Sequence, residues 1–160
     1  MNDEKTQIEN AIRQLQEFLA ANRMRQTRER IVILQTAYKI NGPFTIDQLS
    51  DALKAQNFHV STATLYAATD ILTRANLLLR HPAPVSSMLF ERIPEAGIRC
   101  YQVCNSCRKV KYIERKDVLA AIQQIPVSRF TVSHRMTYIY GICTQCKTKQ
   151  KRQLKQLKSK

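Results

Sequence analysis

Two pairs of cysteines constrain this chain more than any other feature of its sequence. Cys104 and Cys107 form one Cys-x-x-Cys pair, and Cys143 and Cys146 form a second pair after 35 intervening residues. A two-residue gap in a tight turn directs both thiolates at one tetrahedral ion, so two such turns complete a four-sulfur shell. The separation exceeds the roughly 15–20 residues of most zinc ribbons. We therefore predict a structural zinc ion that joins two distant segments of one small domain.

Other roles for these cysteines are disulfides, reactive thiols or plain core positions. Disulfides need an oxidising compartment, and the polar stretch from Met1 to Lys5 does not resemble a signal peptide, which favours a cytoplasmic location. A thiol redox enzyme would carry its pair at the start of a helix, whereas Cys107 is followed by a strand-like run, Arg108 to Ile113. No acid–base partner stands beside the cysteines, so we expect no enzymatic activity.

The charge of the chain indicates a polyanionic partner. It has 26 basic and 12 acidic residues, a formal net charge of +14, and such an excess repels itself unless an anion neutralises it. Nucleic acid is the first candidate and an acidic membrane surface the second, although no apolar run is long enough to span a bilayer. A merely soluble basic protein is the remaining alternative. Without Trp and with only five Phe, the chain lacks the aromatic platform of single-strand binders.

The first half of the chain has helical periodicity. Apolar residues at three- and four-residue steps predict helices over about 2–21, 28–39, 45–56 and 61–75. Thr45 and Gln48 have the spacing of a capping box, and Ser61 is a candidate cap of the fourth helix. We expect Ala63, Leu65 (or Tyr66), Ala68, Ile71 and Leu72 on the inner side of that helix. Two short helices joined by a tight turn, near residues 57–60, predict a helix-turn-helix.

Two strand-like runs follow, at about 77–80 and 88–91. The proline-rich segment 81–87 connects them, and we expect His81 to be exposed at its tip. Three helices followed by a hairpin predict a winged helix, and a small helical bundle is the alternative. We assign residues 1–93 to this first domain.

The pattern then changes from helices to strands. Pro94 to Gly97 is the predicted linker and hinge, and strands are expected at 98–103, 110–113 and 130–140 with a helix at about 117–125. This second, α/β domain, 98–146, is too small to bury a large core, which is a physical reason for a metal staple. A partner subunit would cover a face or edge of its sheet. The tail, 147–160, has seven basic and no acidic residues and is either a frayed helix or a disordered arm.

Several of these segments together resemble the ferric uptake regulator (Fur) family of metal-responsive repressors. The resemblance runs from about Met24 to Cys146. It rests on Met24-Arg-Gln-Thr27 with Arg30, on Ser61-Thr-Ala-Thr-Leu-Tyr66, on Phe90-Glu91, and on both cysteine pairs with their flanks. It implies an α+β protein in which a winged-helix domain precedes an α/β dimerisation domain, and a homodimer on palindromic promoter DNA.

The residue chemistry agrees with this implied role. The start of a recognition helix presents short polar side chains to base edges, and the resemblance places Ser61, Thr62, Thr64 and Tyr66 there. Ser61 would alternatively act only as a helix cap, and Tyr66 as a core residue. Arg25, Arg28 and Arg30 would contact the phosphate backbone and add affinity without sequence information. The family has Arg directly after this Tyr, whereas this chain has Ala67.

The resemblance fails at the regulatory metal site. The family has a histidine-rich segment before the first cysteine pair, and residues 96–103 of this chain contain no histidine. Glu91 and the displaced His134 remain, and they are too few for a divalent sensing site. We therefore expect iron- or manganese-dependent switching to be lost or altered. Cys100, the fifth cysteine, is a buried residue, a redox-sensing thiol or a haem ligand, so Glu91, Cys100 and His134 form the candidate effector site.

Two rivals to a DNA-binding regulator stay open. The first is an RNA-binding zinc-ribbon protein, which the charge and basic tail also allow. The second is the thiol redox enzyme described above.

Overall fold

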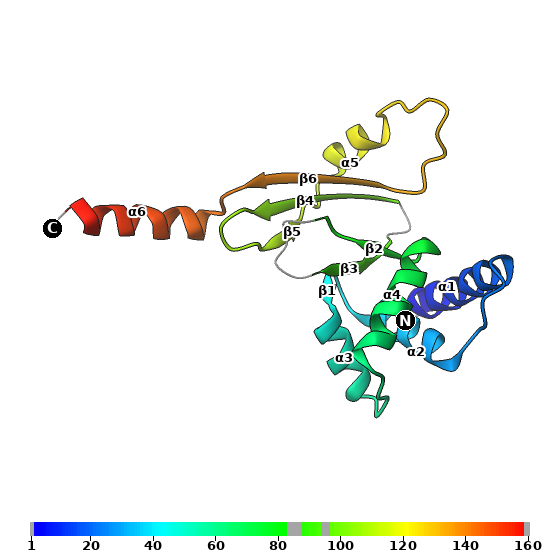
Figure 1. Ribbon diagram of the computed structural model, residues 1–160. Coiled ribbons are helices and arrows are strands. Elements are labelled where there is room, and N and C mark those ends of the chain that lie inside the picture. Colours follow the sequence, from blue (N-terminus) through cyan, green and yellow to red (C-terminus); the bar gives the residue numbers. More distant parts are fainter. Residues whose placement is uncertain (1, 83–87, 94–96, 159–160) are drawn as a thin grey trace. The chain divides into compact units, whose positions relative to one another are not determined.

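A computed structural model describes residues 2–82, 88–93 and 97–158. They form two compact units, residues 2–82 with 88–93 (unit 1) and residues 97–158 (unit 2) (Figure 1). The predicted α+β class is confirmed, with a helical N-terminal part and a small C-terminal sheet. Of the predicted linker 94–97 only Gly97 is described, and residues 83–87 of the predicted wing connection also lie outside the described parts. Within the described parts, no helix is both long enough and apolar enough to cross a membrane.

Unit 1 begins with the four predicted helices, which end within a few residues of the expected positions. They are α1 (Asn2–Ala21), α2 (Arg28–Lys39), α3 (Ile46–Lys54) and α4 (Thr62–Arg74). A side-chain cap marks the start of each of the other three helices, α2, α3 and α4. The side-chain oxygen of Thr27 accepts from Arg30 N–H, and that of Ser61 accepts from Thr64 N–H.

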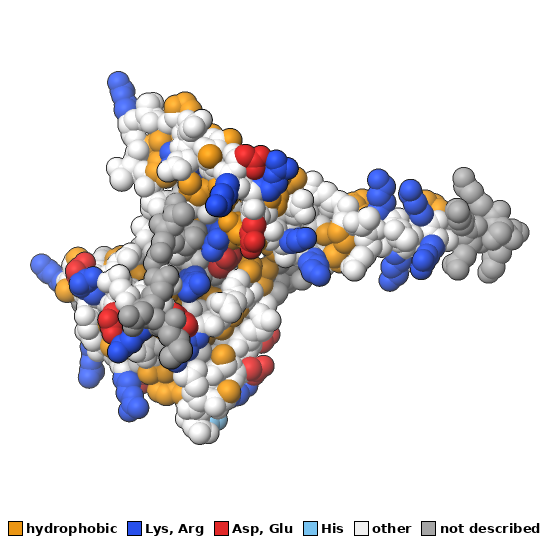
Figure 2. Space-filling view, turned by 180° about the vertical axis from the view of Figure 1, so that it is seen from behind, with side chains coloured by type: hydrophobic (Ala, Val, Ile, Leu, Met, Phe, Trp, Pro, Cys, Tyr) orange, Lys and Arg blue, Asp and Glu red, His pale blue; other side chains and the backbone are white. Residues whose placement is uncertain are grey.

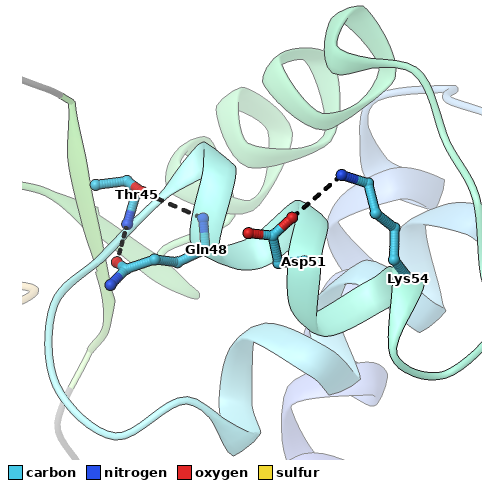
Figure 3. A network of polar contacts seen from close by, with 4 residues as sticks. All are labelled: Thr45, Gln48, Asp51 and Lys54. Carbon is cyan, nitrogen blue, oxygen red and sulfur yellow. Dashed lines mark hydrogen bonds and ion pairs between the residues drawn. The ribbon is translucent and has the colours of Figure 1, made fainter.

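The start of α3 is capped twice. Thr45 Oγ1 accepts from Gln48 N–H at 3.2 Å, and Gln48 Oε1 accepts from Thr45 N–H at 2.9 Å (Figure 3). This is the predicted capping box, and it satisfies two backbone donors that a helix start leaves free. Asp51 and Lys54 pair one turn later at 3.1 Å on the exposed face of α3, whereas Leu49 and Leu53 are buried.

The inner faces of these helices form one hydrophobic core. Leu15, Leu34, Leu49 and Leu65 have no exposed surface, and each comes from a different helix. In α4 the expected inner positions are correct for Leu65, Ala68, Ile71 and Leu72, whereas Ala63 is exposed. Tyr66 is 43% exposed, so its alternative role as a core residue is wrong.

A three-stranded sheet completes unit 1. Its strands are β1 (Phe44–Thr45), β2 (Leu78–Arg80) and β3 (Leu89–Arg92), in the order β1-β3-β2 and antiparallel throughout. The hairpin of β2 and β3 is the predicted wing. β1 was not predicted because two residues give no periodic signal. Phe44 and Phe90, paired across β1 and β3, have ring centroids 6.4 Å apart.

The expectation that His81 is exposed is wrong. Its backbone N–H donates to Leu89 O at 2.9 Å, which extends the hairpin by one step. Its ring is buried, and Nε2 lies 3.1 Å from Oε2 of the equally buried Glu91. A buried polar ring costs free energy unless it is hydrogen-bonded, so the carboxylate on the neighbouring strand explains how His81 is accommodated inside.

Unit 2 is built on three strands, β4 (Ile98–Cys104), β5 (Val110–Tyr112) and β6 (Arg135–Gly141), in the order β5-β4-β6. β5 is antiparallel to β4, and β6 is parallel to it. The predicted strand 130–140 was five residues too long at its start, because Phe130 to His134 form a loop in which Phe130 is 72% exposed. Parallel pairing begins where Arg135 N–H donates to Gly97 O at 2.6 Å.

One helix, α5 (Lys116–Gln123), packs on one face of this sheet. The buried cluster between them contains only Ile98, Cys100 and Ile122, with Ile113, Val118 and Leu119 at its margin. The opposite face is aromatic: Tyr101 stacks on Tyr138 with centroids 5.5 Å apart. The hydrophobic cluster beneath α5 is small, as the sequence predicted, and a second source of stability is needed.

The basic tail is a helix rather than a disordered arm. α6 (Thr144–Lys158) starts inside the second cysteine pair and runs across the predicted boundary between domain and tail at 146/147. Its first turn closes when Lys147 N–H donates to Cys143 O at 2.9 Å.

Candidate functional site

The turn after β4 and the start of α6 bring the four paired cysteines together. Cys104 is the last residue of β4, and the turn after it carries Cys107 and returns the chain to β5. The turn is closed by Arg108 N–H to Cys104 O at 2.8 Å and by Cys104 N–H to Lys109 O at 3.0 Å. Cys143 and Cys146 lie at the start of α6, directly after β6.

Parallel pairing of β4 with β6 sets the distance between the two turns. The register joins Cys104 to Gly141, so both strands end at the same edge of the sheet. Asn105 N–H donates to Gly141 O at 2.7 Å and ties the first turn to the end of β6. The 35-residue separation in sequence therefore closes to bonding distance in space.

The four sulfur atoms all lie within 4.8 Å of one another. Cys107 Sγ and Cys143 Sγ are 3.9 Å apart, far beyond the roughly 2.05 Å of a disulfide. Zinc–sulfur bonds of about 2.3 Å in a tetrahedron place sulfurs about 3.8 Å apart. The donor set and its spacing fit a structural zinc ion, and the predicted pairing of the two turns is confirmed.

Electrostatics also favour a cation here. The backbone N–H groups of Cys107 and Cys143 lower the pKa of Cys104 to about 6, so one thiolate forms readily. At Cys146 the Ser106 hydroxyl lowers the pKa, but the sulfurs of Cys143, Cys107 and Cys104 outweigh it and raise the pKa to about 11. Four close thiolates repel one another, and a bound divalent ion removes that repulsion.

The predicted base-reading residues lie at the start of α4. Ser61, Thr62, Thr64 and Tyr66 are all exposed. Ser61 is the helix cap, and its hydroxyl also lies 2.8 Å from that of Thr64, so the predicted cap is confirmed, and its contact with DNA stays a prediction. Thr62 and Tyr66 have free access to solvent.

The three predicted phosphate-contacting arginines lie at the junction of α1 and α2. Arg25 and Arg28 are exposed, and Arg30 is half-buried because its guanidinium donates to the backbone oxygen of Arg25. Arg30 therefore makes a contact within the junction, which the sequence pattern alone did not indicate.

A sequence profile of the ferric uptake regulator family matches residues 21–140 of the chain. The chain belongs to the ferric uptake regulator family. No individual curated protein sequence matches it. The match includes the helix-turn-helix and the first cysteine pair.

Solved structures support the same fold at low sequence identity. The Helicobacter pylori ferric uptake regulator is 12% identical, with 88% of this chain and 93% of that chain covered at a TM-score of 0.64. The Pseudomonas aeruginosa regulator, solved with manganese, is 18% identical, with coverage of 79% and 95% and a TM-score of 0.62. The Vibrio cholerae regulator is 19% identical, with coverage of 78% and 96% and a TM-score of 0.55.

The candidate effector residues of this Fur-family chain lie in two units, Glu91 in unit 1 and Cys100 and His134 in unit 2. Glu91 is engaged by His81 in unit 1. In unit 2, Cys100 has no exposed surface beneath α5, and burial raises its pKa, as expected of an inert buried thiol. His134 is half-buried, with Nδ1 3.0 Å from the Ser133 hydroxyl. Throughout the described parts of the chain, the four paired cysteines are the only cluster of three or more candidate ligands.

Proposed function

We propose that this chain is a transcription regulator that binds palindromic promoter DNA as a homodimer. One observation carries the proposal: in a chain of this family, α4 exposes Thr62, Thr64 and Tyr66 at its N-terminal end. Short polar groups and one aromatic ring at that position suit base edges and thymine methyl groups in a major groove. Arg25 and Arg28 would neutralise phosphates beside it.

The proposed dimer uses unit 2. Its zinc site stabilises the sheet, and an uncovered face or edge of that sheet would pair with a second copy. Ile139 and Ile142, in and just after the outer strand β6, are each 50% exposed, and exposed apolar residues on an edge strand favour such a contact. Two copies related by a two-fold axis would present two α4 helices to two half-sites.

We further propose that iron and manganese do not switch this regulator in the usual way. The described residues offer the four-cysteine site but no second cluster of hard ligands, and Glu91 already has a protein partner. Haem or oxidant sensing through Cys100 remains a prediction. Any effector would act by changing the angle between the units through the hinge at 94–97.

Selection of bound sequences from random duplex DNA tests the proposal directly. We expect a palindromic consensus bound by dimers, and a loss of specific binding for Thr62→Ala and Tyr66→Ala. Thr73→Ala is the matched control, since Thr73 lies 11 positions later in the same helix, with its hydroxyl bonded to Thr69 O. Repeating the selection with ferrous ion, manganous ion and haemin tests the switching.

The selection also has outcomes that contradict the proposal. Absence of any consensus, together with stronger binding to structured RNA, would favour the RNA-binding alternative. A steep requirement for iron or manganese would overturn the proposed loss of metal switching.

A further inference from the structure

α6 is the most strongly charged element of the molecule. Its 15 residues include no acidic side chain. The basic residues are Lys147, Lys149, Lys151, Arg152, Lys155 and Lys158. Basic side chains lie along the part of this helix that is coloured by type in Figure 2. The helix therefore carries six of the 26 basic residues of the chain and no acidic residue.

The helix has almost no apolar support. From Thr144 to Leu154 every side chain except that of Cys146 is exposed, and Leu154 itself is 58% exposed. None of its residues from Thr144 to Leu154 belongs to either hydrophobic cluster of the described chain. A helix of this length is marginal in water by itself. Lysines four positions apart destabilise it further, by a few tenths of a kcal/mol per pair.

The lysines are not spread evenly around α6. Lys147, Lys151, Lys155 and Lys158 follow one another at steps of four, four and three, so their positions share one face of the helix. We call these four positions the lysine stripe. It extends about 16 Å along the axis. Lys149 and Arg152 lie outside it, displaced by more than 50° around the axis at 100° per residue.

The four-sulfur cluster lies at the N-terminal end of this helix. Cys146 belongs to the four-sulfur cluster and to the first turn of α6, and Lys147 N–H donates to Cys143 O. The first residue of the lysine stripe is thus adjacent to a ligand position. A bound ion would orient the start of the helix and hold it in the folded unit.

We propose that the lysine stripe of α6 is a second DNA contact, which binds the phosphate backbone of duplex outside the base pairs that α4 reads. The inference rests on the proposed function and adds to it a site for flanking DNA. Phosphates would relieve the repulsion between the lysines and so stabilise the helix that presents them.

The chemistry of α6 favours duplex DNA over other polyanions. It has no aromatic residue, and single-stranded RNA or DNA is bound mainly through aromatic stacking. Membrane-surface helices need a broad apolar face, whereas Leu154 and Leu157 are the only large apolar residues of α6. The lysine stripe is thus a regular row of positive charges without aromatic residues or a broad apolar face, and it suits the regular row of phosphates of a duplex.

Two double variants of the full-length, zinc-loaded protein test the proposal. Lys151→Gln with Lys155→Gln removes two charges from the lysine stripe, and Lys149→Gln with Arg152→Gln removes two charges from the same helix outside it. Gln retains helix propensity. Affinity is measured as a function of salt on the selected operator alone, and on the operator extended by about 10 bp, one helical turn, on each side.

We expect the stripe variant to bind the extended operator about 10- to 30-fold more weakly at 0.15 M salt, with a salt slope smaller by about 2 per chain. On the short operator it should match the unaltered protein, and the off-stripe variant should match it on both. Equal losses of affinity for the two variants, or no loss for either, would show that the lysine stripe is not the DNA contact. A loss confined to an RNA hairpin or to vesicles of anionic lipid would overturn duplex DNA as the partner.

Failure of the proposed function gives a different result. If no operator is selected, sequence-specific regulation is wrong, but the same two variants can be compared on random duplex. A smaller salt slope for the stripe variant alone would then still support the contact, and identical slopes would overturn it.

Discussion

The backbone N–H of Cys143 donates to the sulfur of Cys104 at 3.3 Å, across 39 positions of the chain. This bond joins the two cysteine turns directly, and with the N–H of Cys107 it explains why the pKa of Cys104 falls to about 6. The same contact therefore brings the turns together and prepares a thiolate for a metal ion.

Zinc retention should depend on pH, because protons compete with the ion for all four sulfurs. The folded-state pKa of Cys104 is lowered from an ordinary value near 9 to about 6. The stabilisation by its N–H donors is therefore complete above about pH 9 and is lost as pH falls through about 6. We expect zinc to be retained at pH 7 and released progressively below about pH 6, when Cys104 also loses this stabilisation and protons compete for all four sulfurs. A chromogenic zinc chelator measures the release, and retention of zinc at pH 4 would contradict the prediction.

Removal of one ligand should unfold unit 2 selectively. Cys107→Ser leaves three sulfurs, and apparent zinc-binding free energies of about 10–16 kcal/mol are a large part of the stability of small zinc modules. We expect loss of zinc and of the unit 2 transition in calorimetry, while the separate core of unit 1 still melts cooperatively. Cys100→Ala is the control because Cys100 lies outside the cluster. Equal zinc content in both variants would sink the four-sulfur assignment.

The metal site could be predicted because its signal is local. Each Cys-x-x-Cys pair specifies its own turn, and only the meeting of the two turns needed tertiary structure. Parallel pairing of Cys104 with Gly141 supplies that meeting, and no sequence period shows which strands will pair. The helical starts at Thr27, Thr45 and Ser61 were predictable for the same local reason.

The errors arise where distant residues decide the outcome. His81 was expected outside because it lies in the proline-rich segment 81–87 that connects two strands, but its ring is buried against the carboxylate of Glu91. β1 is a strand through its pairing with β3, in which Phe44 lies opposite Phe90. The tail is helical from Thr144, and its sequence alone, rich in repelling lysines, did not separate helix from disorder.

Glu91 should stabilise unit 1 through its contact with His81 rather than act as a metal ligand. Its carboxylate is buried against His81 Nε2, and Glu91→Ala leaves a buried ring nitrogen without this partner. We expect a loss of about 1–3 kcal/mol in the free energy of unfolding of unit 1 in metal-free buffer. Glu91→Gln keeps an acceptor and should lose less. Urea denaturation measures both, and unchanged stability of the Ala variant would show that the pair is not formed.

The arginines at the junction should separate into two kinds. Arg28→Gln removes an exposed charge, so we expect the salt slope of DNA binding to fall by about 1 per chain with an unchanged melting temperature. Arg30→Gln also removes the bond to Arg25 O, and both DNA affinity and melting temperature should fall. Equal melting temperatures for the two variants would remove the structural role of Arg30.

Leu65 and Tyr66 are adjacent in α4 and should have opposite effects when shortened. Leu65 has no exposed surface, whereas Tyr66 is 43% exposed at the end of the helix proposed to read bases. Leu65→Ala creates a cavity in the core, and we expect a loss of about 2–5 kcal/mol in the free energy of unfolding.

Tyr66→Ala should change stability by less than about 0.5 kcal/mol, because it removes no core contact. It should nevertheless abolish discrimination between operator and random duplex, since the ring and hydroxyl are lost from the end of α4 that is proposed to contact DNA. Urea denaturation and competition binding, carried out on both variants, separate the two effects. If Tyr66→Ala retained full specificity while folding normally, α4 would not read bases through this residue, and the recognition role would pass to Thr62 and Thr64 alone.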